Sequence, residues 1–294
     1  MRHLSLLTLL GLSIATPALA CDNYDAAVAA VQSNDAAAAT ALFDGLVADN
    51  DCTDDFREWV GDFLARDAFA VTLTDADDAT KRAALQTALG YERHWRSFAG
   101  LGHLDWAAAD YANAAANFQL ALNELAEGDQ SHDAATDEIA EIYQLATAAL
   151  ALSDDVVDLP VTRAGNPSVM LTGKVRGFEV EEIPLPITFE YNSVQFDAAG
   201  LDYANALVNH LLMVNPVSVN LGGHTDPVGG EDFNLALSEA RAEALATYIK
   251  AAGFTGDIIT TPYGESRLPE PPAGIEAGSE EHHRIARRVS FASQ

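Results

Sequence analysis

The chain has 294 residues, of which 49% are apolar, and a formal net charge of −28. Its length allows one large domain or two ordinary ones, and its composition is that of a folded protein. So large an acidic excess repels phosphate backbones, which argues against nucleic acid as a partner and against broad docking on anionic lipid. Residues 21–155 carry 26 acidic and 6 basic side chains, and residues 156–294 carry 18 and 9, so the amino-terminal half is the more acidic.

Residues 1–20 have the pattern of a signal peptide. Arg2 and His3 precede an apolar run, Leu4–Ile14, and Ala18 and Ala20 provide the small side chains that a signal peptidase accepts. The run is too short to span a bilayer, and we expect no transmembrane segment in the mature chain. The sequence therefore predicts export to the periplasm.

The two cysteines, Cys21 and Cys52, allow two interpretations. An exported protein with two cysteines most simply pairs them, and this disulfide would close a loop of about thirty residues. Cys21 also follows the cleavage point directly, as the lipidated cysteine of a bacterial lipoprotein does. Ala18 stands where a lipobox usually has leucine, and lipidation would leave Cys52 unpaired, so we favour the disulfide over the lipid anchor.

Residues 21–152 are rich in alanine, with large apolar residues at helical spacing and almost no proline. This pattern predicts an all-helical domain built from hairpins. The expected helices include Tyr24–Ser33, Asp54–Ala70, Asp78–Tyr91 and Ser131–Leu152. Such a domain is expected to bind a protein partner or act as a scaffold rather than to catalyse a reaction.

One stretch of this region is more specific. Phe98, Leu101 and Gly102 are followed by Asp110, Tyr111, Ala114, Phe118, Ala121 and Leu122. The spacing resembles the two helices of a tetratricopeptide repeat, in which small residues let antiparallel helices approach while aromatic rings fill the gaps. The alternative is an alanine-rich bundle without repeat ancestry.

Residues 153–186 contain several aspartates, glycines and prolines and show no helical period. Prolines such as Pro160, Pro184 and Pro186 interrupt any helix, so we expect a linker with at most a short strand or two.

Residues 187–294 alternate between strand and helix patterns. The expected elements are strand Ile187–Tyr191, helix Asp197–Val214, strand Val217–Gly222, helix Glu231–Ala252, and strands Asp257–Tyr263 and Val289–Phe291. This order, βαβαββ, predicts an α/β sandwich with the helices on one face of the sheet.

Four motifs in this region, in the same order, resemble the OmpA-like family. They are Phe189-Glu190-Tyr191-Asn192-Ser193; Gly223-His224-Thr225-Asp226 followed by Asn234, Leu237, Ser238, Arg241 and Ala242; Tyr263-Gly264-Glu265-Ser266 with Pro269; and Arg287-Arg288-Val289. The resemblance covers about 108 residues. It implies an OmpA-like α/β sandwich that binds peptidoglycan.

The resemblance also implies a ligand and two main contacts. In the family, an aspartate and an arginine hold the diaminopimelate of the peptidoglycan stem peptide, and these match Asp226 and Arg241. Diaminopimelate carries an ammonium and a carboxylate on one carbon, so a carboxylate and a planar guanidinium are suitable partners for it. The alternative is an ordinary surface ion pair of the two side chains.

Four further residues match positions near the ligand in the family: Asn234, Tyr191, Asn192 and Thr225. Asn234 has an equally good alternative as the N-cap of its helix, and Tyr191 has one as a core residue. We expect His224 to shape the turn. We expect no cofactor, no metal site and no catalytic residues.

The sequence departs from the family pattern at two places. Ala286 stands where the family usually has asparagine, and residues 267–283 are longer and more acidic than usual. Glu280, Glu281, His282 and His283 suggest a metal cluster, but we expect a solvated, mobile insertion instead. The roles of Arg287 and Arg288 stay open.

The leading functional hypothesis is a non-catalytic envelope protein that binds peptidoglycan through diaminopimelate and tethers a helical interaction domain to the wall. The first alternative is a periplasmic assembly scaffold that acts mainly through its helices. A remote alternative is a wall hydrolase, for which the sequence shows no nucleophile or metal motif.

Overall fold

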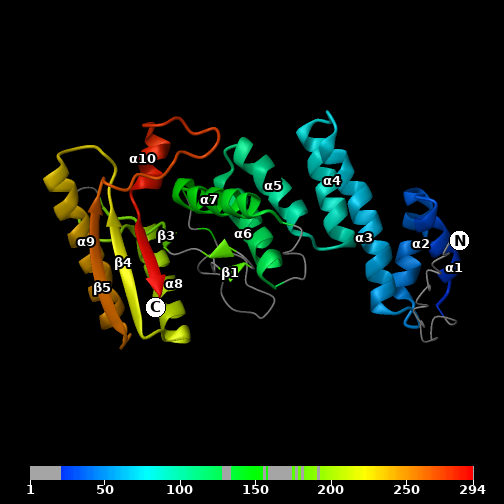
Figure 1. Ribbon diagram of the computed structural model, residues 1–294, viewed down its shortest axis with the longest axis horizontal. Coiled ribbons are helices and arrows are strands. Elements are labelled where there is room, and N and C mark those ends of the chain that lie inside the picture. Colours follow the sequence, from blue (N-terminus) through cyan, green and yellow to red (C-terminus); the bar gives the residue numbers. More distant parts are fainter. Residues whose placement is uncertain are drawn as a thin grey trace, which may run out of the picture.

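The computed structural model describes residues 21–127, 134–154, 157, 174–175, 178–179, 182–190 and 193–293. The expected signal peptide, residues 1–20, lies outside them. Figure 1 shows a series of helices that begins at the amino-terminal end and leads to a sheet with its own helices. We call α1–α7 (residues 24–152) the helical region, and β3–β6 (residues 183–293) the sheet domain. The predicted fold class, helical hairpins followed by an α/β domain, is confirmed.

The helical region opens with α1 (Tyr24–Gln32), α2 (Ala36–Ala48), α3 (Asp54–Ala70) and α4 (Asp78–Tyr91), with a 3₁₀ turn, η1 (Val71–Leu73), after α3. The side chains of Asp35, Thr53 and Asp77 each accept a backbone N–H of the helix that follows. These caps satisfy amide groups that a helix start leaves unpaired, and they fix where each helix begins. For this reason α3 and α4 have the bounds that the sequence predicts.

The helices α5 (Trp95–Ala107), α6 (Tyr111–Glu127) and α7 (Thr136–Leu152) enclose the main core of the helical region. Phe118 is fully buried there. A Cβ atom added to Gly102 would lie 2.7 Å from the Phe118 ring, so only glycine allows α5 and α6 to come this close. The close approach fits the tetratricopeptide-like pattern, while repeat ancestry stays a prediction.

The sheet domain contains β3 (Ile183–Leu185), α8 (Ala198–Val214), β4 (Ser218–His224), α9 (Glu231–Ala251), β5 (Asp257–Gly264), α10 (Glu280–Ala286) and β6 (Val289–Ser293). Its strand order is β3-β6-β4-β5. β4 and β5 are parallel, and β6 runs antiparallel to both β3 and β4. The strand that comes latest in the chain therefore lies inside the sheet.

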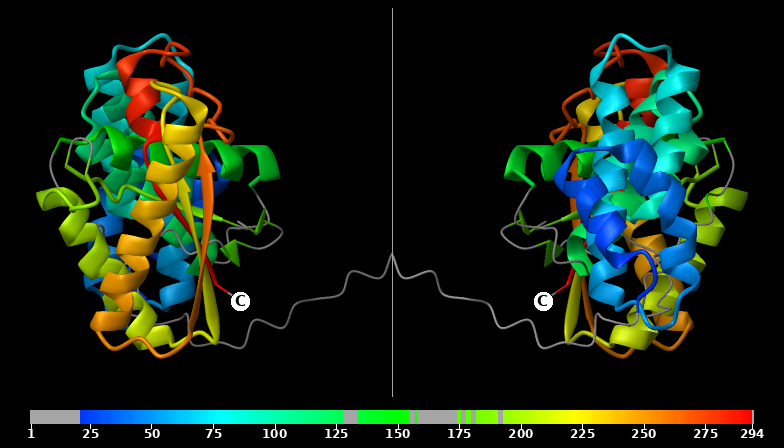
Figure 2. Two further views of the ribbon diagram at one scale, coloured as in Figure 1. Left: turned by 90° about the vertical axis from the view of Figure 1, so that its left-hand side faces the viewer. Right: turned by 90° about the vertical axis from the view of Figure 1, so that its right-hand side faces the viewer.

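Helices α8 and α9 cover the same face of this sheet (Figure 2). Leu207 and Leu211 of α8 and Leu245 of α9 share one buried cluster with Val219 and Leu221 of β4. The two strand residues are two positions apart, so they point to the same face. The buried leucines and valines of this cluster form the core that supports the site described below.

The first strand of the sheet lies earlier in the chain than predicted. We expected it at residues 187–191, but β3 is Ile183–Leu185, and Phe189 makes only an isolated bridge to Phe196. Pro184 and Pro186 led us to expect a linker here, because proline has no backbone N–H to donate to a neighbouring strand. β3 is an edge strand that bonds only to β6, and proline is tolerated at an edge. Two further short strands, β1 (Lys174–Val175) and β2 (Phe178–Glu179), pair with each other before it.

Residues 267–286, which we call the strap, connect β5 to β6 through α10. We expected residues 267–283 to be solvated and mobile. Most of these residues are exposed, as expected, whereas Pro272 and His282 are buried. The mobility of the segment stays a prediction. His282 is buried, its Nδ1 accepts the Gly278 N–H at 3.0 Å, and its Nε2 lies 2.8 Å from the Pro269 carbonyl oxygen. Both nitrogens of His282 are thus used within the strap itself.

The strap also joins the two regions of the molecule. The Trp106 indole N–H donates to the Ala273 carbonyl at 2.9 Å, and the Gln144 side chain donates to the Glu270 carbonyl at 3.0 Å. Ile285 of α10 packs with Ala148 and other residues of α7 in a small apolar cluster. The insertion therefore forms an interface between the sheet domain and the helical region.

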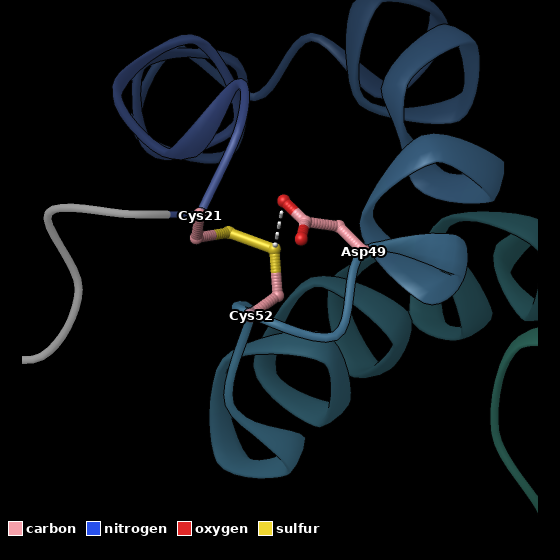
Figure 3. A group of neighbouring side chains, drawn as sticks. All are labelled: Cys21, Asp49 and Cys52. Carbon is pink, nitrogen blue, oxygen red and sulfur yellow. Dashed lines mark hydrogen bonds between the residues drawn. A yellow bond between two sulfur atoms is a disulfide. The ribbon is translucent and has the colours of Figure 1, made fainter.

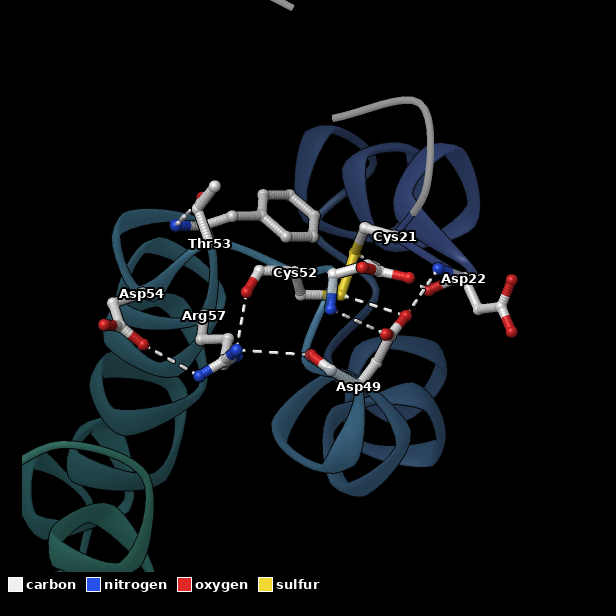
Figure 4. Close-up of a disulfide and its surroundings, with 9 residues drawn as sticks. Cys21, Asp22, Asp49, Cys52, Thr53, Asp54 and Arg57 are labelled. Atoms are coloured by element: carbon white, nitrogen blue, oxygen red, sulfur yellow. Dashed lines mark hydrogen bonds and ion pairs between the residues drawn. A yellow bond between two sulfur atoms is a disulfide. The ribbon is translucent and has the colours of Figure 1, made fainter. Parts of the chain in front are cut away.

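A disulfide joins Cys21 to Cys52 (Figure 3). It ties the start of α1 to the turn between α2 and α3, where both cysteines are buried. Asp49 lies beside it and accepts the backbone N–H groups of Asp51 and Asp22, which lower the pKa of its carboxyl group. Arg57 donates to the carbonyl oxygens of Cys52 and Asp49, as Figure 4 shows. Within the described residues, no helix combines the length and the apolar character needed to cross a bilayer.

Candidate ligand-binding site

A cavity of about 350 Å³ lies where the sheet domain meets the end of α7. From the sheet domain it is lined by Phe189, His224 and Arg241, and on the other side by Leu150 of α7 and by Asp154, two residues after the end of α7. The structure therefore places a predicted ligand residue, Arg241, at a cavity with walls from both regions.

Asp226 follows β4 and is held in place by two hydrogen bonds. Its Oδ1 accepts the Val228 N–H at 3.0 Å, and its Oδ2 lies 2.6 Å from Nη1 of Arg287. The second terminal nitrogen of Arg287 lies 2.5 Å from Glu280. Burial alone would lower the pKa of Arg287, but the hydrogen bonds to Glu280 and Asp226 outweigh it and raise that pKa. Arg287, at the start of the last predicted motif, is the partner of Asp226.

Arg241 lies on α9 and has fewer partners than Arg287. Its Nε donates to the Ser193 carbonyl at 3.2 Å, and its guanidinium lies 5.0 Å from the centre of the Phe189 ring. Burial, and next the nearby charge of Arg287, lower the pKa of Arg241, while Asp226 raises it. The three side chains thus interact electrostatically, and they place one carboxylate near two guanidinium groups.

Asn234 is not the N-cap of α9, because Gly230 occupies that position. Its side chain is buried, and it donates to the Asp226 carbonyl at 3.3 Å and to Glu265 at 2.5 Å. Asn234 therefore positions the loop that carries Asp226. The Thr225 side chain is also buried, and its hydroxyl has no partner among the described residues. Tyr191 and Asn192 lie outside the described residues, so their predicted roles stay predictions.

His224 is buried at the end of β4 and belongs to a polar network that reaches neighbouring strands. Its Nε2 lies 2.9 Å from the Ser290 hydroxyl, which donates to Glu182, and its ring stacks on Tyr263 with centroids 4.9 Å apart. Ser290 is 2% exposed and binds both His224 and Glu182, so the histidine does not lie between the serine and the acid as it does in a catalytic triad. The network stabilises β4, and Ser290 is not arranged as an activated nucleophile.

The stability of the sheet domain is expected to fall as the pH is lowered below about 6.5. Burial, then Arg288 and Arg267, lower the pKa of His224 from its ordinary 6.5 to about 3. Between these values the unfolded chain binds a proton that the folded domain excludes, so stability is lost as pH falls, with a slope approaching about 1.4 kcal/mol per pH unit. Above pH 6.5 this group contributes no pH dependence.

Urea unfolding followed by circular dichroism, at several pH values between 7.5 and 4, measures this slope. Carboxylates also titrate at the lower end, so the wild-type slope is compared with that of His224→Gln, whose amide keeps a donor near the position of Nε2. Equal slopes for the two proteins between pH 6.5 and 5 would show that His224 is protonated in the folded state.

Within the described residues, one cluster of side chains has the spacing of a metal site: Cys21, Asp49 and Cys52. Both sulfur atoms belong to the disulfide, so they are not available as thiolate ligands (Figure 3). The residues Arg287 and Glu280 join the candidate site without having been assigned to it from the sequence. The double arginine after α10 is the sequence feature that could have indicated a role for Arg287 in the site. Nothing in the sequence linked Glu280 to Asp226.

No protein-family model matches the chain. Several curated proteins, among them the following two, are similar to part of it. The peptidoglycan-binding protein ArfA of Mycobacterium tuberculosis is 33% identical over 76 residues, which are 26% of this chain and 23% of ArfA. The peptidoglycan-associated lipoprotein of Legionella pneumophila is 32% identical over 104 residues, which are 35% of this chain and 56% of that protein. The chain thus spans about a quarter to about half the length of these relatives.

Among solved structures, the OmpA-like domain of FopA1 from Francisella tularensis matches with 25% identity and a TM-score of 0.30. The match covers 38% of this chain and 72% of that one. The sequence relatives correspond to the carboxy-terminal part, where the four motifs and the strand–helix order had indicated the same family. The carboxy-terminal part of this chain is an OmpA-like domain.

Proposed function

We propose that this chain is a non-catalytic cell-envelope protein whose OmpA-like domain binds peptidoglycan through the diaminopimelate of the stem peptide. The observation that carries the proposal is the placement of Asp226 next to Arg287 and within electrostatic range of Arg241. The similarity to a peptidoglycan-binding protein and to a peptidoglycan-associated lipoprotein supports a role at the wall.

The arrangement suits a zwitterion. The free end of diaminopimelate carries an ammonium group, whose hydrogen bonds Asp226 can accept. It also carries a carboxylate, which can accept two hydrogen bonds from the planar guanidinium of Arg241. Charge-assisted hydrogen bonds of this kind contribute on the order of 1.5–3 kcal/mol each. The side chain of Asp226 is 13% exposed, so a ligand reaches a carboxylate that is largely shielded from water. Shielding strengthens such contacts relative to an exposed surface pair.

The role of Arg287 follows from its bond to Asp226. The pair neutralises Asp226 in the ligand-free protein, which stabilises a carboxylate that would otherwise be buried without a partner. Each carboxylate oxygen can accept more than one hydrogen bond, so an incoming ammonium can share Asp226 with Arg287. Arg287 is thus a positioning residue for Asp226. Glu280 holds Arg287, and Asn234 holds the loop that carries Asp226.

The helical region has a different role in this proposal. Its core is separate from that of the OmpA-like domain, and α1–α4 extend away from the site (Figure 1). We propose that it presents a surface for a protein partner while the OmpA-like domain holds the wall. The expected location is the periplasm, at the cell wall or the outer membrane.

Co-sedimentation of the mature protein with purified sacculi tests the proposal. The wild type is expected to sediment with the sacculi, and Asp226→Ala or Arg241→Ala is expected to weaken binding by ten- to a hundredfold, from the loss of a charge-assisted contact of about 1.5–3 kcal/mol. The matched controls are Asp257→Ala and Arg66→Ala, which remove the same charges at exposed positions on β5 and α3.

Two results would contradict the proposal. The first is binding that Asp226→Ala and Arg241→Ala leave undiminished, which would overturn the site. The second is the release of soluble fragments from the sacculi during incubation, which would point to a hydrolase. Mass spectrometry of the mature amino terminus distinguishes the disulfide at Cys21 from a lipid anchor.

A further inference from the structure

The cavity beside the proposed diaminopimelate site concentrates positive charge in an acidic protein. Four of the 16 lysine and arginine residues of the chain line it: Arg241, Arg284, Arg287 and Arg288. The chain as a whole carries a formal charge of −28. A local group of arginines in such a field can attract an anionic group that the rest of the surface repels.

The four arginines differ in how firmly their partners hold them. Arg288 donates to the carbonyl oxygens of Ala286 and Arg267, and Arg287 binds Asp226 and Glu280. These contacts lie within the OmpA-like domain. Arg284, in contrast, reaches across to the end of α7 in the helical region.

The contacts of Arg284 are weak enough to exchange. Its Nη1 lies 3.0 Å from Asp154, and its Nη2 donates to the Ser153 carbonyl at 3.2 Å. The Asp154 side chain is 89% exposed, and that of Arg284 is 33% exposed. Ion pairs with so exposed a partner contribute little, because water screens them. Arg284 can therefore turn from Asp154 to a ligand carboxylate at little cost in stability.

We propose that Arg284 forms a second anion subsite in this cavity, which binds a further carboxylate of the stem peptide whose diaminopimelate lies at Asp226 and Arg241. This proposal rests on the proposed function. In it, the end of α7 is a wall of the ligand site, so the helical region contributes to wall binding directly. Asp154 holds Arg284 at the cavity until the ligand replaces it.

The peptide carries suitable groups. A stem tripeptide of L-alanine, γ-linked D-glutamate and diaminopimelate presents a carboxylate on the glutamyl residue. It presents another on the peptide-side carbon of diaminopimelate. Either is an anion for the guanidinium fork of Arg284, and amidation of the carboxylate removes the charge while keeping the size.

Calorimetry with the full mature chain and this tripeptide tests the proposal. Arg284→Gln is expected to weaken binding about fivefold, and Asp154→Asn to leave it unchanged or strengthen it, because the freed Arg284 becomes more available. Arg66→Gln, at an exposed position on α3, is the matched control and should bind as the wild type does. Two probes, amidated at one carboxylate or the other, complete the set. The Arg284→Gln effect should disappear with the probe that lacks the carboxylate bound by Arg284.

Each outcome decides between the alternatives. If Arg284→Gln and Asp154→Asn weaken binding equally, the ion pair between Arg284 and Asp154 has only a structural role and the proposed subsite is wrong. The same holds if Arg284→Gln binds as the wild type does, or if its effect persists with both amidated probes. These results leave the proposed function intact as long as the wild type binds and Arg241→Ala binds ten- to a hundredfold more weakly. Failure of the wild type to bind the tripeptide would instead contradict the proposed function. Thermal unfolding of each variant shows that it is folded.

Discussion

Replacement of Gly223 by alanine is expected to destabilise the OmpA-like domain by about 3 kcal/mol or more, because small-to-large changes at closely packed positions are costly. A Cβ atom at this position would lie 2.0 Å from the Ser238 carbonyl oxygen and 2.7 Å from its carbon. Both are backbone atoms of α9, so neither can rotate away. The chain must move β4 away from α9 to accommodate even one methyl group.

The same change is expected to weaken peptidoglycan binding. Gly223 lies three residues before Asp226 on the strand that leads to the site, and Ser238 lies three residues before Arg241 on the helix. A shift between strand and helix therefore separates the two proposed ligand contacts.

Urea unfolding of Gly223→Ala and of the wild type, followed by circular dichroism, measures the loss of stability. Gly45→Ala is the matched control, since a Cβ at this exposed position of α2 meets no atom within 4 Å and the change should cost no stability. If Gly223→Ala unfolds at the same urea concentration as the wild type, β4 and α9 do not approach as closely as described here.

Loss of the disulfide is expected to destabilise the amino-terminal end of the helical region by roughly 3–4 kcal/mol in the chain-entropy model. The bond joins residues 31 positions apart, and it anchors the residues before α1 to the turn between α2 and α3. The hydrogen bond from the Asp22 N–H to Asp49, at 2.7 Å, is exposed and is not expected to replace it.

The double change Cys21→Ser and Cys52→Ser, measured by thermal unfolding with circular dichroism, tests this expectation. The wild type treated with a reductant should match the variant, and the variant itself should not respond to the reductant. Because the disulfide lies far from the OmpA-like domain, binding to sacculi should be unchanged. A melting temperature that neither treatment alters would mean that the bond contributes no stability.

The sequence predicts most of the helices well, because their signals are local. Asp77 caps α4, and the apolar positions that follow recur at helical spacing, so both the start and the extent of the helix can be read. The position of β3 could not be read in the same way. In an isolated segment, Pro184 indicates the end of a helix or strand, but at the edge of a sheet proline is tolerated within a strand. Only the partner strand, about a hundred residues away, decides which of these applies.

In the candidate site, too, local sequence motifs predicted some residues, whereas contacts between distant residues could not be predicted. Motif spacing indicated Asp226 and Arg241, because both lie within the central family signature. The bond between Asp226 and Arg287 joins residues 61 positions apart, and the path of the strap between them determines whether they meet. The packing of the strap itself depends on Trp106 and Gln144, more than a hundred residues away. No local pattern contains that information.

The position of β6 within the sheet has a consequence for the order in which the chain folds. β3 and β4 do not bond to each other, since both pair with β6 at residues 289–293. As the chain emerges from a ribosome or an export channel, the helical hairpins can close from neighbouring residues, but the sheet lacks its central partner until those residues arrive. Until then, the edges of β3 and β4 and the apolar faces of α8 and α9 are exposed. The carboxy-terminal half is therefore expected to depend on a chaperone during folding more than the helical half does.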